Sequence, residues 1–218
     1  MRIDVWSDIV CPWCYIGKGR FERALAGFEH RDEVDIVHRS FQLDPVSARG
    51  TAHDHRDRLM FKYGMSRSEA DATQIRMERT AAEEGLEFHL VGGVTGNTVD
   101  AHRLLCLARE RGMQQVLLER LYRAHFTEQR SVFDPESLAV LAGEVGLDSE
   151  EAAGVLAGST YADAVAADSR EARELRIGGV PYYRIDDRHA VSGAQPPESF
   201  SRALTGAWLA RTVSSGAS

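Results

Sequence analysis

The N-terminal part of the chain alternates apolar and polar residues first with the period of a strand, then of a helix, then of a strand again. Arg2–Val10 is rich in apolar and β-branched residues and predicts a strand. Pro12 suits the first position of a helix, because it lacks an N–H that would be unpaired there, and we expect this helix to end near His30. Its apolar residues follow the spacing of one helix face: Phe21, Leu25 and Phe28. Residues 34–41 alternate again and predict a second strand, which Asp44-Pro45 ends.

A long helical stretch follows, and then a second α/β segment. Residues 47–158 are rich in helix formers and capping residues, and we expect them to be helical except for 86–97, where Gly92-Gly93 and Gly96-Asn97 are turn signals. Residues 159–176 predict one more amphipathic helix, which the run Gly178-Gly179-Val180-Pro181 breaks. Residues 182–186 and 189–192 have the pattern of two paired strands, and a final helix closes the chain.

This order predicts a discontinuous α/β domain. The two outer segments, 1–46 and 159–218, together complete a single α/β unit, so we assign them to one domain. Residues 47–158 then form an α-helical domain inserted into it.

Composition narrows the classes of function. The chain has 218 residues, of which 43% are hydrophobic and 27% charged, as in soluble globular proteins. A net charge of -7 argues against a nucleic-acid partner. No apolar run approaches the roughly 18–20 residues that span a membrane, so we expect no membrane partner. The residues after Met1 lack the apolar region of a signal peptide, which predicts a cytoplasmic protein.

The three cysteines point to redox chemistry. In a reducing compartment the close pair Cys11 and Cys14 is more consistent with a catalytic or metal-binding role than with a structural disulfide. A tetrahedral zinc site needs four ligands, and the chain has no second CxxC, so we expect no metal. Cys106 lies among leucines on a predicted helix and is expected to be a buried structural thiol.

The position of the pair between a strand and a helix gives each cysteine a role. Free N–H groups and the dipole at a helix N-terminus stabilise a thiolate, so we expect Cys11 to be the nucleophile. Cys14 lies one turn along the same face and can resolve the mixed disulfide. Between them, Pro12 and Trp13 are expected to tune the reduction potential.

Several motifs, in order along the chain, resemble the DsbA-like branch of the thioredoxin superfamily, and in finer detail the FrnE-like DsbA proteins. The motifs are Ser7-Asp8-Ile9-Val10-Cys11-Pro12-Trp13-Cys14-Tyr15-Ile16-Gly17, Phe41-Gln42-Leu43-Asp44-Pro45, Asn97-Thr98 with Ala101-His102-Arg103-Leu104, Gly179-Val180-Pro181, and Val191-Ser192-Gly193-Ala194-Gln195. Hydroxychromene carboxylate isomerases and kappa-class glutathione transferases are related to this group. The resemblance implies a thioredoxin-like fold with a large inserted α-helical domain.

The resemblance also implies a cis peptide bond between Val180 and Pro181 that faces the cysteines, with the backbone of Val180 pairing to an extended substrate. On the residues alone, an ordinary trans proline in a loop is the better prediction. Tyr182 is a candidate for the substrate groove. Because Pro12-Trp13 differs from the Pro-His of DsbA, the resemblance does not imply a strongly oxidising potential.

Two further groups have both a functional and a structural interpretation. Asp8 either relays protons or orients a substrate, as an acid at this place does in the related transferases, or it faces solvent at the strand end or caps the helix. Gly193, Ala194 and Gln195 precede a helix N-terminus, which is an anion site that holds glutathione in those relatives, or they simply cap the helix.

The other polar motifs suggest no separate chemistry. His53 and His55 are expected to be solvated, while His102 and Arg103 either face the active-site cleft or take part in packing and ion pairs. Gly92–Gly96 lacks the GK[ST] ending of a phosphate-binding loop, which excludes nucleotide binding of that kind.

We therefore predict a thiol–disulfide oxidoreductase that binds no separate cofactor and reacts with protein thiols or with glutathione. A glutathione-dependent isomerase or transferase acting on a small aromatic or polyketide-like molecule is the first alternative, and a chaperone-like binding module is the second. The sequence sets neither the direction of exchange nor the oligomeric state.

Overall fold

The computed structural model describes residues 1–215, with side chains through Arg211. Its main sheet has four strands in the order β2-β1-β5-β6. They are β1 (Arg2–Ser7), β2 (Asp35–Ser40), β5 (Tyr182–Ile185) and β6 (His189–Ser192). β1 is parallel to β2 and antiparallel to β5, and β5 and β6 form an antiparallel hairpin.

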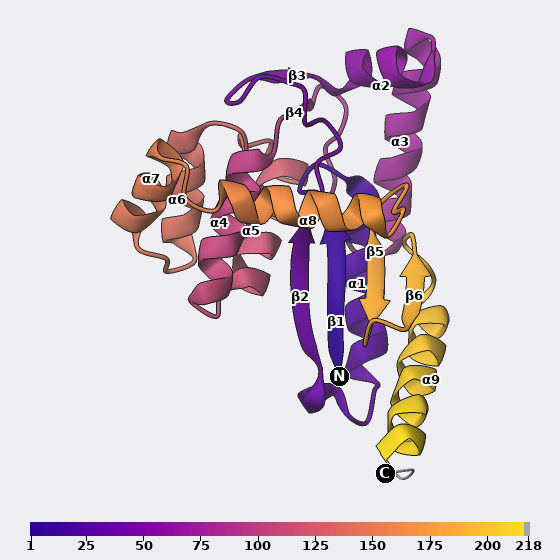
Figure 1. Ribbon diagram of the computed structural model, residues 1–218. Helices are drawn as coiled ribbons and strands as arrows, with labels where there is room; N and C mark the ends of the chain where they lie inside the picture. The colour runs from indigo at the N-terminus through magenta and orange to yellow at the C-terminus, as the bar shows by residue number, and fades with distance from the viewer. Residues whose placement is uncertain (216–218) are drawn as a thin grey trace.

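Helices cover both faces of this sheet. α1 (Pro12–Ala26) and α9 (Pro197–Ser215) lie on one face, where Phe21 and Phe200 pack with Tyr183. α8 (Ala162–Glu174) crosses the opposite face (Figure 1), where Trp6 packs against Ala172. The predicted thioredoxin-like α/β fold is confirmed.

The inserted region is mostly helical. Its helices are α2 (His55–Tyr63), α3 (Arg67–Glu83), α4 (Val99–Glu110), α5 (Gln114–Phe126), α6 (Pro135–Glu144) and α7 (Ser149–Ala157). Two short strands were not predicted: β3 (Ala52–Asp54), where a helix was expected, pairs with β4 (Val94–Gly96), where turns were expected, in a second, antiparallel sheet. Gly96 permits this pairing, since a Cβ there would collide with the carbonyl oxygen of Thr51.

Several predicted boundaries move for identifiable reasons. β1 ends at Ser7, not Val10, because the apolar side chains of Ile9 and Val10 leave the sheet and join a core formed with the inserted helices. α1 ends at Ala26 rather than near His30. α8 begins at Ala162 rather than at 159, after Tyr161 in a left-handed conformation with φ of 65°.

One hydrophobic cluster joins the start of α1 to the insertion. It contains Cys11, Cys14, Tyr15 and Ile16 together with buried residues of α4, α5, α6 and α7. Tyr15 stacks on Tyr122 of α5 with ring centroids 4.7 Å apart. The CxxC segment therefore lies inside the core of the helical region, while the division of the chain into domains at residues 46 and 158 stays a prediction. Among the described residues, no helix is both long and apolar enough to cross a membrane.

Candidate active site

The CxxC motif forms the first turn of α1, as the sequence predicts. Cys11 is the N-cap residue in an extended conformation, and Pro12 occupies the first turn. The carbonyl of Cys11 accepts the N–H of Cys14 at 2.9 Å, which closes the turn. Both thiols are free, with exposed fractions of 5% for Cys11 and 2% for Cys14, while Trp13 between them is 41% exposed.

The two thiols have different surroundings. The Sγ of Cys11 donates to the carbonyl oxygen of Val180 at 3.7 Å. Cys14 lies deeper, and its burial raises the pKa of its thiol well above the usual value, to which the neighbouring Cys11 thiol adds. A hydrogen bond with the main chain of Asp8 opposes this shift only in part. The surroundings of Cys14 therefore disfavour its thiolate form.

The loop facing the cysteines contains the Val180–Pro181 peptide, which is cis, as the resemblance implies. Pro181 is buried, and its carbonyl accepts the N–H of Gly193 at 2.8 Å. The Gly193–Gln195 turn is thereby held beside Pro181. The carbonyl of Ala194 in this turn also accepts the guanidinium of Arg20 on α1 at 2.6 Å.

Gly17 is a site residue whose role pattern analysis did not identify. A Cβ at Gly17 would lie 2.8 Å from Cγ of Pro181, 3.0 Å from the hydroxyl of Tyr183 and 3.3 Å from Cβ of Ala194. The glycine therefore lets α1 approach the proline loop and the Gly193–Gln195 turn together. The only indication of this role in the sequence is the position of Gly17 at the end of the Ser7–Gly17 motif, three residues after Cys14.

The two tyrosines after the proline point to opposite faces of the sheet. Tyr182 is half-buried and packs edge-on against Trp6, with centroids 6.2 Å apart. Tyr183 is a buried core residue against Phe21 and Phe200. The participation of Tyr182 in a substrate groove stays a prediction.

Asp8 lies fully buried behind the motif. Its Oδ2 accepts the N–H of Leu43 at 2.7 Å, and its Oδ1 lies 3.4 Å from Nε2 of His102 on α4. The solvent-facing interpretation of Asp8 is wrong, and so is the cap, because α1 has no side-chain cap. The charge of Asp8 contributes to the raised pKa of Cys14.

Arg103, which follows His102 in the Ala101–Leu104 motif, has a structural role. Arg103 pairs with Asp100 at 2.7 Å and donates to the carbonyls of Val155, Gly158 and Thr160. It thereby holds the chain between α7 and α8.

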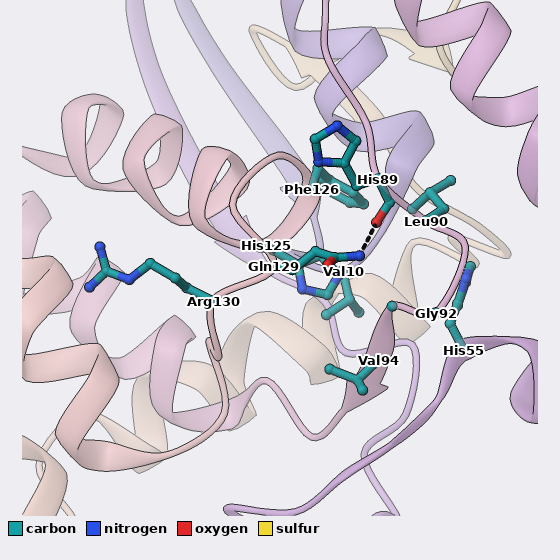
Figure 2. Close-up of a pocket in the computed structure, with 11 residues that line it drawn as sticks. Val10, His55, His89, Leu90, Gly92, Val94, His125, Phe126, Gln129 and Arg130 are labelled. Atoms are coloured by element: carbon teal, nitrogen blue, oxygen red, sulfur yellow. Dashed lines mark hydrogen bonds between the residues drawn. The ribbon is translucent and has the colours of Figure 1, made fainter.

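A cavity of about 160 Å³ lies in the inserted region beside Val10, the residue before Cys11. Figure 2 shows His125 and Gln129 beside Val10, with His55 at the far side. His55 is half-buried and hydrogen-bonded to Gln74 at 3.0 Å, so the prediction that it is solvated is wrong, whereas His53 is exposed. The described residues contain no cluster of three or more potential metal ligands.

A second cavity, of about 20 Å³, lies directly beside Cys14. Its polar lining consists of Cys14, Lys18, Glu22, His38, Gln115 and Tyr122, with the hydroxyl-bearing Tyr183 at its wall.

Cys106, the third cysteine, lies away from this cavity. It is half-buried, not buried as predicted, and its partial burial raises the pKa of its thiol to about 11.

Comparison with known proteins identifies the family. A probable DsbA oxidoreductase from Streptomyces coelicolor is 51% identical, with a TM-score of 0.91 over 95% of this chain and 90% of that chain. The uncharacterized protein YwbO of Bacillus subtilis is 27% identical over 209 residues, 94% of this chain and 96% of its own. The cytosolic disulfide reductase DsbM from Pseudomonas aeruginosa, solved with glutathione, shares the fold at 18% identity and a TM-score of 0.65, over 94% of this chain and 98% of that chain. The model of the DSBA-like thioredoxin domain matches residues 2–205, and this protein, with its buried Cys11–Cys14 pair, therefore belongs to the DSBA-like thioredoxin domain family.

Proposed function

We propose that the protein catalyses dithiol–disulfide exchange, with Cys11 as the nucleophile and Cys14 as the resolving thiol. The observation that carries this proposal is the position of Cys11 at the N-terminus of α1, with its Sγ 3.7 Å from the carbonyl of Val180. The thiolate of Cys11 attacks a substrate disulfide and forms a mixed disulfide. Cys14 then attacks the Sγ of Cys11, which forms the Cys11–Cys14 disulfide and releases the substrate thiol.

The proline loop is suited to hold an extended substrate beside Cys11. The main-chain N–H of Val180 donates to no described residue, so it is free to bind a carbonyl of a partner chain. A peptide pairing there would place its own cysteine next to Cys11. Val180 and Pro181 are thus the proposed substrate-binding residues.

Glutathione is the proposed small thiol partner. The structure of DsbM was solved with glutathione, and the turn Gly193–Gln195 of this chain lies beside Pro181 and immediately before α9. At the start of α9, Pro197 has no N–H and the N–H of Ser199 donates to the carbonyl of Pro196, so the N–H of Glu198 is the proposed donor to a carboxylate. Glutathione would reduce the pair between turnovers where the reduction potential of the pair lies above that of the glutathione pool.

The test is a redox titration of the Cys11–Cys14 couple against glutathione, with an insulin reduction assay in parallel. The expected result is a single two-electron midpoint and insulin reduction that Cys11→Ser abolishes. Activity of the Cys11→Ser variant on a glutathione-linked aromatic substrate would instead support an isomerase. Binding of unfolded chains without any redox midpoint would support a chaperone-like module.

A further inference from the structure

The cavity of about 160 Å³ in the inserted region lies next to the reactive cysteine, because Val10 forms part of its wall. Consecutive Cα atoms lie about 3.8 Å apart, so this wall begins one residue from Cys11. The cavity opens to solvent, since four of its lining residues are exposed: His89, Gly92, Val94 and Gln129. A cavity of about 150 Å³ can hold a benzene molecule. A side chain of a substrate joined to Cys11 can therefore enter it.

The wall of this cavity combines apolar side chains with nitrogen-bearing ones. The apolar residues are Val10, Leu90, Val94 and Phe126, and the polar side chains are those of His55, His89, His125, Gln129 and Arg130. No carboxylate is among the described residues that line it. A wall of this kind offers hydrogen-bond donors and no negative charge, which favours an anionic ligand.

Two of these polar side chains already have partners. The guanidinium of Arg130 pairs with Glu144 at 2.8 Å, and Figure 2 shows Arg130 pointing away from the cavity. The Nδ1 of His89 donates to a main-chain carbonyl at 2.7 Å. The imidazoles of His55 and His125 remain, and both are half-buried.

The ring nitrogens of His55 and His125 can receive a ligand. The side-chain nitrogen of Gln74 donates to the carbonyl of Leu90 at 2.9 Å and lies 3.0 Å from Nδ1 of His55. Nδ1 of His55 is therefore an acceptor, and its Nε2 carries the ring hydrogen. Within the described part of the chain, neither this Nε2 nor either ring nitrogen of His125 has a hydrogen-bond partner. The two rings therefore offer unused N–H donors to a ligand in the cavity.

Both rings are neutral in the free protein near neutral pH. Burial lowers the pKa of His125 to about 4, to which the neighbouring His55 contributes, and burial also lowers the pKa of His55. The charges of Asp8 and Asp54 oppose these shifts without outweighing burial. A carboxylate beside the rings would raise both pKa values, so its binding takes up protons and strengthens as the pH falls below neutral.

We propose that this cavity binds an aspartate or glutamate side chain of the substrate polypeptide, close in its sequence to the cysteine that Cys11 attacks, with His55 and His125 as the hydrogen-bond donors. The proposal rests on the exchange reaction proposed above. Two neutral rings would bind a free anion weakly, but the mixed disulfide ties the carboxylate to the protein and gives it a millimolar effective concentration. His55 and His125 are thus specificity-determining residues and take no part in the sulfur chemistry.

The experiment uses pairs of short peptides, each with one cysteine activated as a mixed disulfide with 2-thiopyridine. Attack by Cys11 on the peptide sulfur releases pyridine-2-thione, which a stopped-flow instrument follows by absorbance. The two peptides of a pair differ only in Glu or Gln at one of the positions nearest the cysteine, and each position is tested in turn. The ratio of the two rates cancels the ionisation of the Cys11 thiol, which both peptides share.

At one position or more, the Glu peptide should react roughly tenfold faster than its Gln partner at mildly acidic pH, and the ratio should decrease at alkaline pH. The net charge of -7 would by itself slow an acidic peptide, so general electrostatic attraction does not produce this result. His125→Phe, which removes both ring nitrogens, should bring the ratio close to one. His55→Gln keeps a partner for Gln74 but binds no proton, and it should lower the ratio by roughly threefold. His53→Gln, at an exposed position that does not line the cavity, is the control and should keep the wild-type ratio.

Three outcomes overturn the inference: a ratio near one at every position in the wild type, a preference for Glu that survives both His125→Phe and His55→Gln, or a preference of equal size at acidic and alkaline pH. In each of these cases, exchange with the Gln peptides would still support the proposed function. Should His125→Phe fold poorly, His55→Gln decides alone. Absence of thione release from every peptide would refute the exchange reaction itself, which is a different result.

Discussion

Cys11 and Cys14 are separated by one helical turn, yet they are surrounded by different kinds of groups. On the Cys11 side the neighbours are main-chain groups and small residues, namely the carbonyl of Val180 and the close approach at Gly17. On the Cys14 side the neighbours are ionisable side chains around a small cavity. Burial of the Cys14 thiol among these side chains raises its pKa, whereas the Sγ of Cys11 lies against the main chain of the proline loop. Two cysteines one turn apart are therefore expected to respond to different kinds of substitution.

Replacing each cysteine in turn should give the largest difference between the two sides. Cys11→Ser is expected to reduce exchange to the uncatalysed level, because it removes the attacking sulfur. Cys14→Ser is expected to retain the first attack and to accumulate a stable mixed disulfide. Intact-protein mass spectrometry after reaction with oxidised glutathione distinguishes them. An adduct on Cys14 in the Cys11→Ser variant would reverse the assigned roles.

The Cys14 side should also be sensitive to acid through His38. Burial lowers its pKa from 6.5 to about 4, so between these values the unfolded chain binds a proton that the folded protein does not. The corresponding stabilisation is complete above the unfolded pKa and is lost as the pH falls toward 4, by on the order of 3 kcal/mol. Urea unfolding over this pH range should show a shallower loss in His38→Gln. His53→Gln, at an exposed position, is the control and should follow the wild type.

The Cys11 side should be sensitive to a single added carbon. Gly17→Ala places a Cβ 2.8 Å from Pro181 and is expected to cost about 1–3 kcal/mol of unfolding free energy. Gly19→Ala, in the same helix with no atom within 4 Å of its Cβ, should instead stabilise the protein by up to about 1 kcal/mol. Thermal unfolding of the two variants gives the comparison. Equal melting temperatures would show that α1 and the proline loop do not depend on this contact.

The smallest effect on stability is expected at Trp13, between the two cysteines. Its side chain is 41% exposed, so Trp13→Ala gives up only part of the burial of a core aromatic and should lower the unfolding free energy by about 1 kcal/mol. Its expected effect is on the redox couple, with a shift of up to about 30 mV in the glutathione titration. An unchanged midpoint would remove Trp13 from the residues that tune the pair.

Local patterns were enough to predict the active-site turn and the four strands of the main sheet. The start of α1 follows from Pro12 after a β-rich segment, and the hairpin follows from alternation on both sides of a short turn, which has three residues, 186–188. Ile9 and Val10 look like strand residues because their apolar character is real, but the side chains that cover them come from helices far along the chain. No local pattern near Ile9 and Val10 reveals that these distant helices pack against them. The three-residue strands β3 and β4 were missed for the same reason.

The residues around Cys14 were only partly predictable. The i, i+4, i+8 spacing of Cys14, Lys18 and Glu22 is visible in the sequence and was a signal available from the start. His38 and Gln115 could not be linked to them, because β2 and α5 meet at Cys14 only through the tertiary fold. The burial of Asp8 against His102 likewise depends on α4 packing onto the loop before α1.

The cluster that joins Cys11 and Cys14 to the inserted helices also affects how the protein can be engineered. A shortened chain without residues 47–158 would expose the inner side of the CxxC turn to water and leave Tyr15 without its stacking partners Phe88, Tyr122 and Phe126. The CxxC turn is therefore not expected to keep its structure when it is separated from the inserted helices. Because Cys11 and Cys14 pack in the same cluster as α4 and α5, amide exchange rates in those helices are expected to differ between the oxidised and the reduced protein.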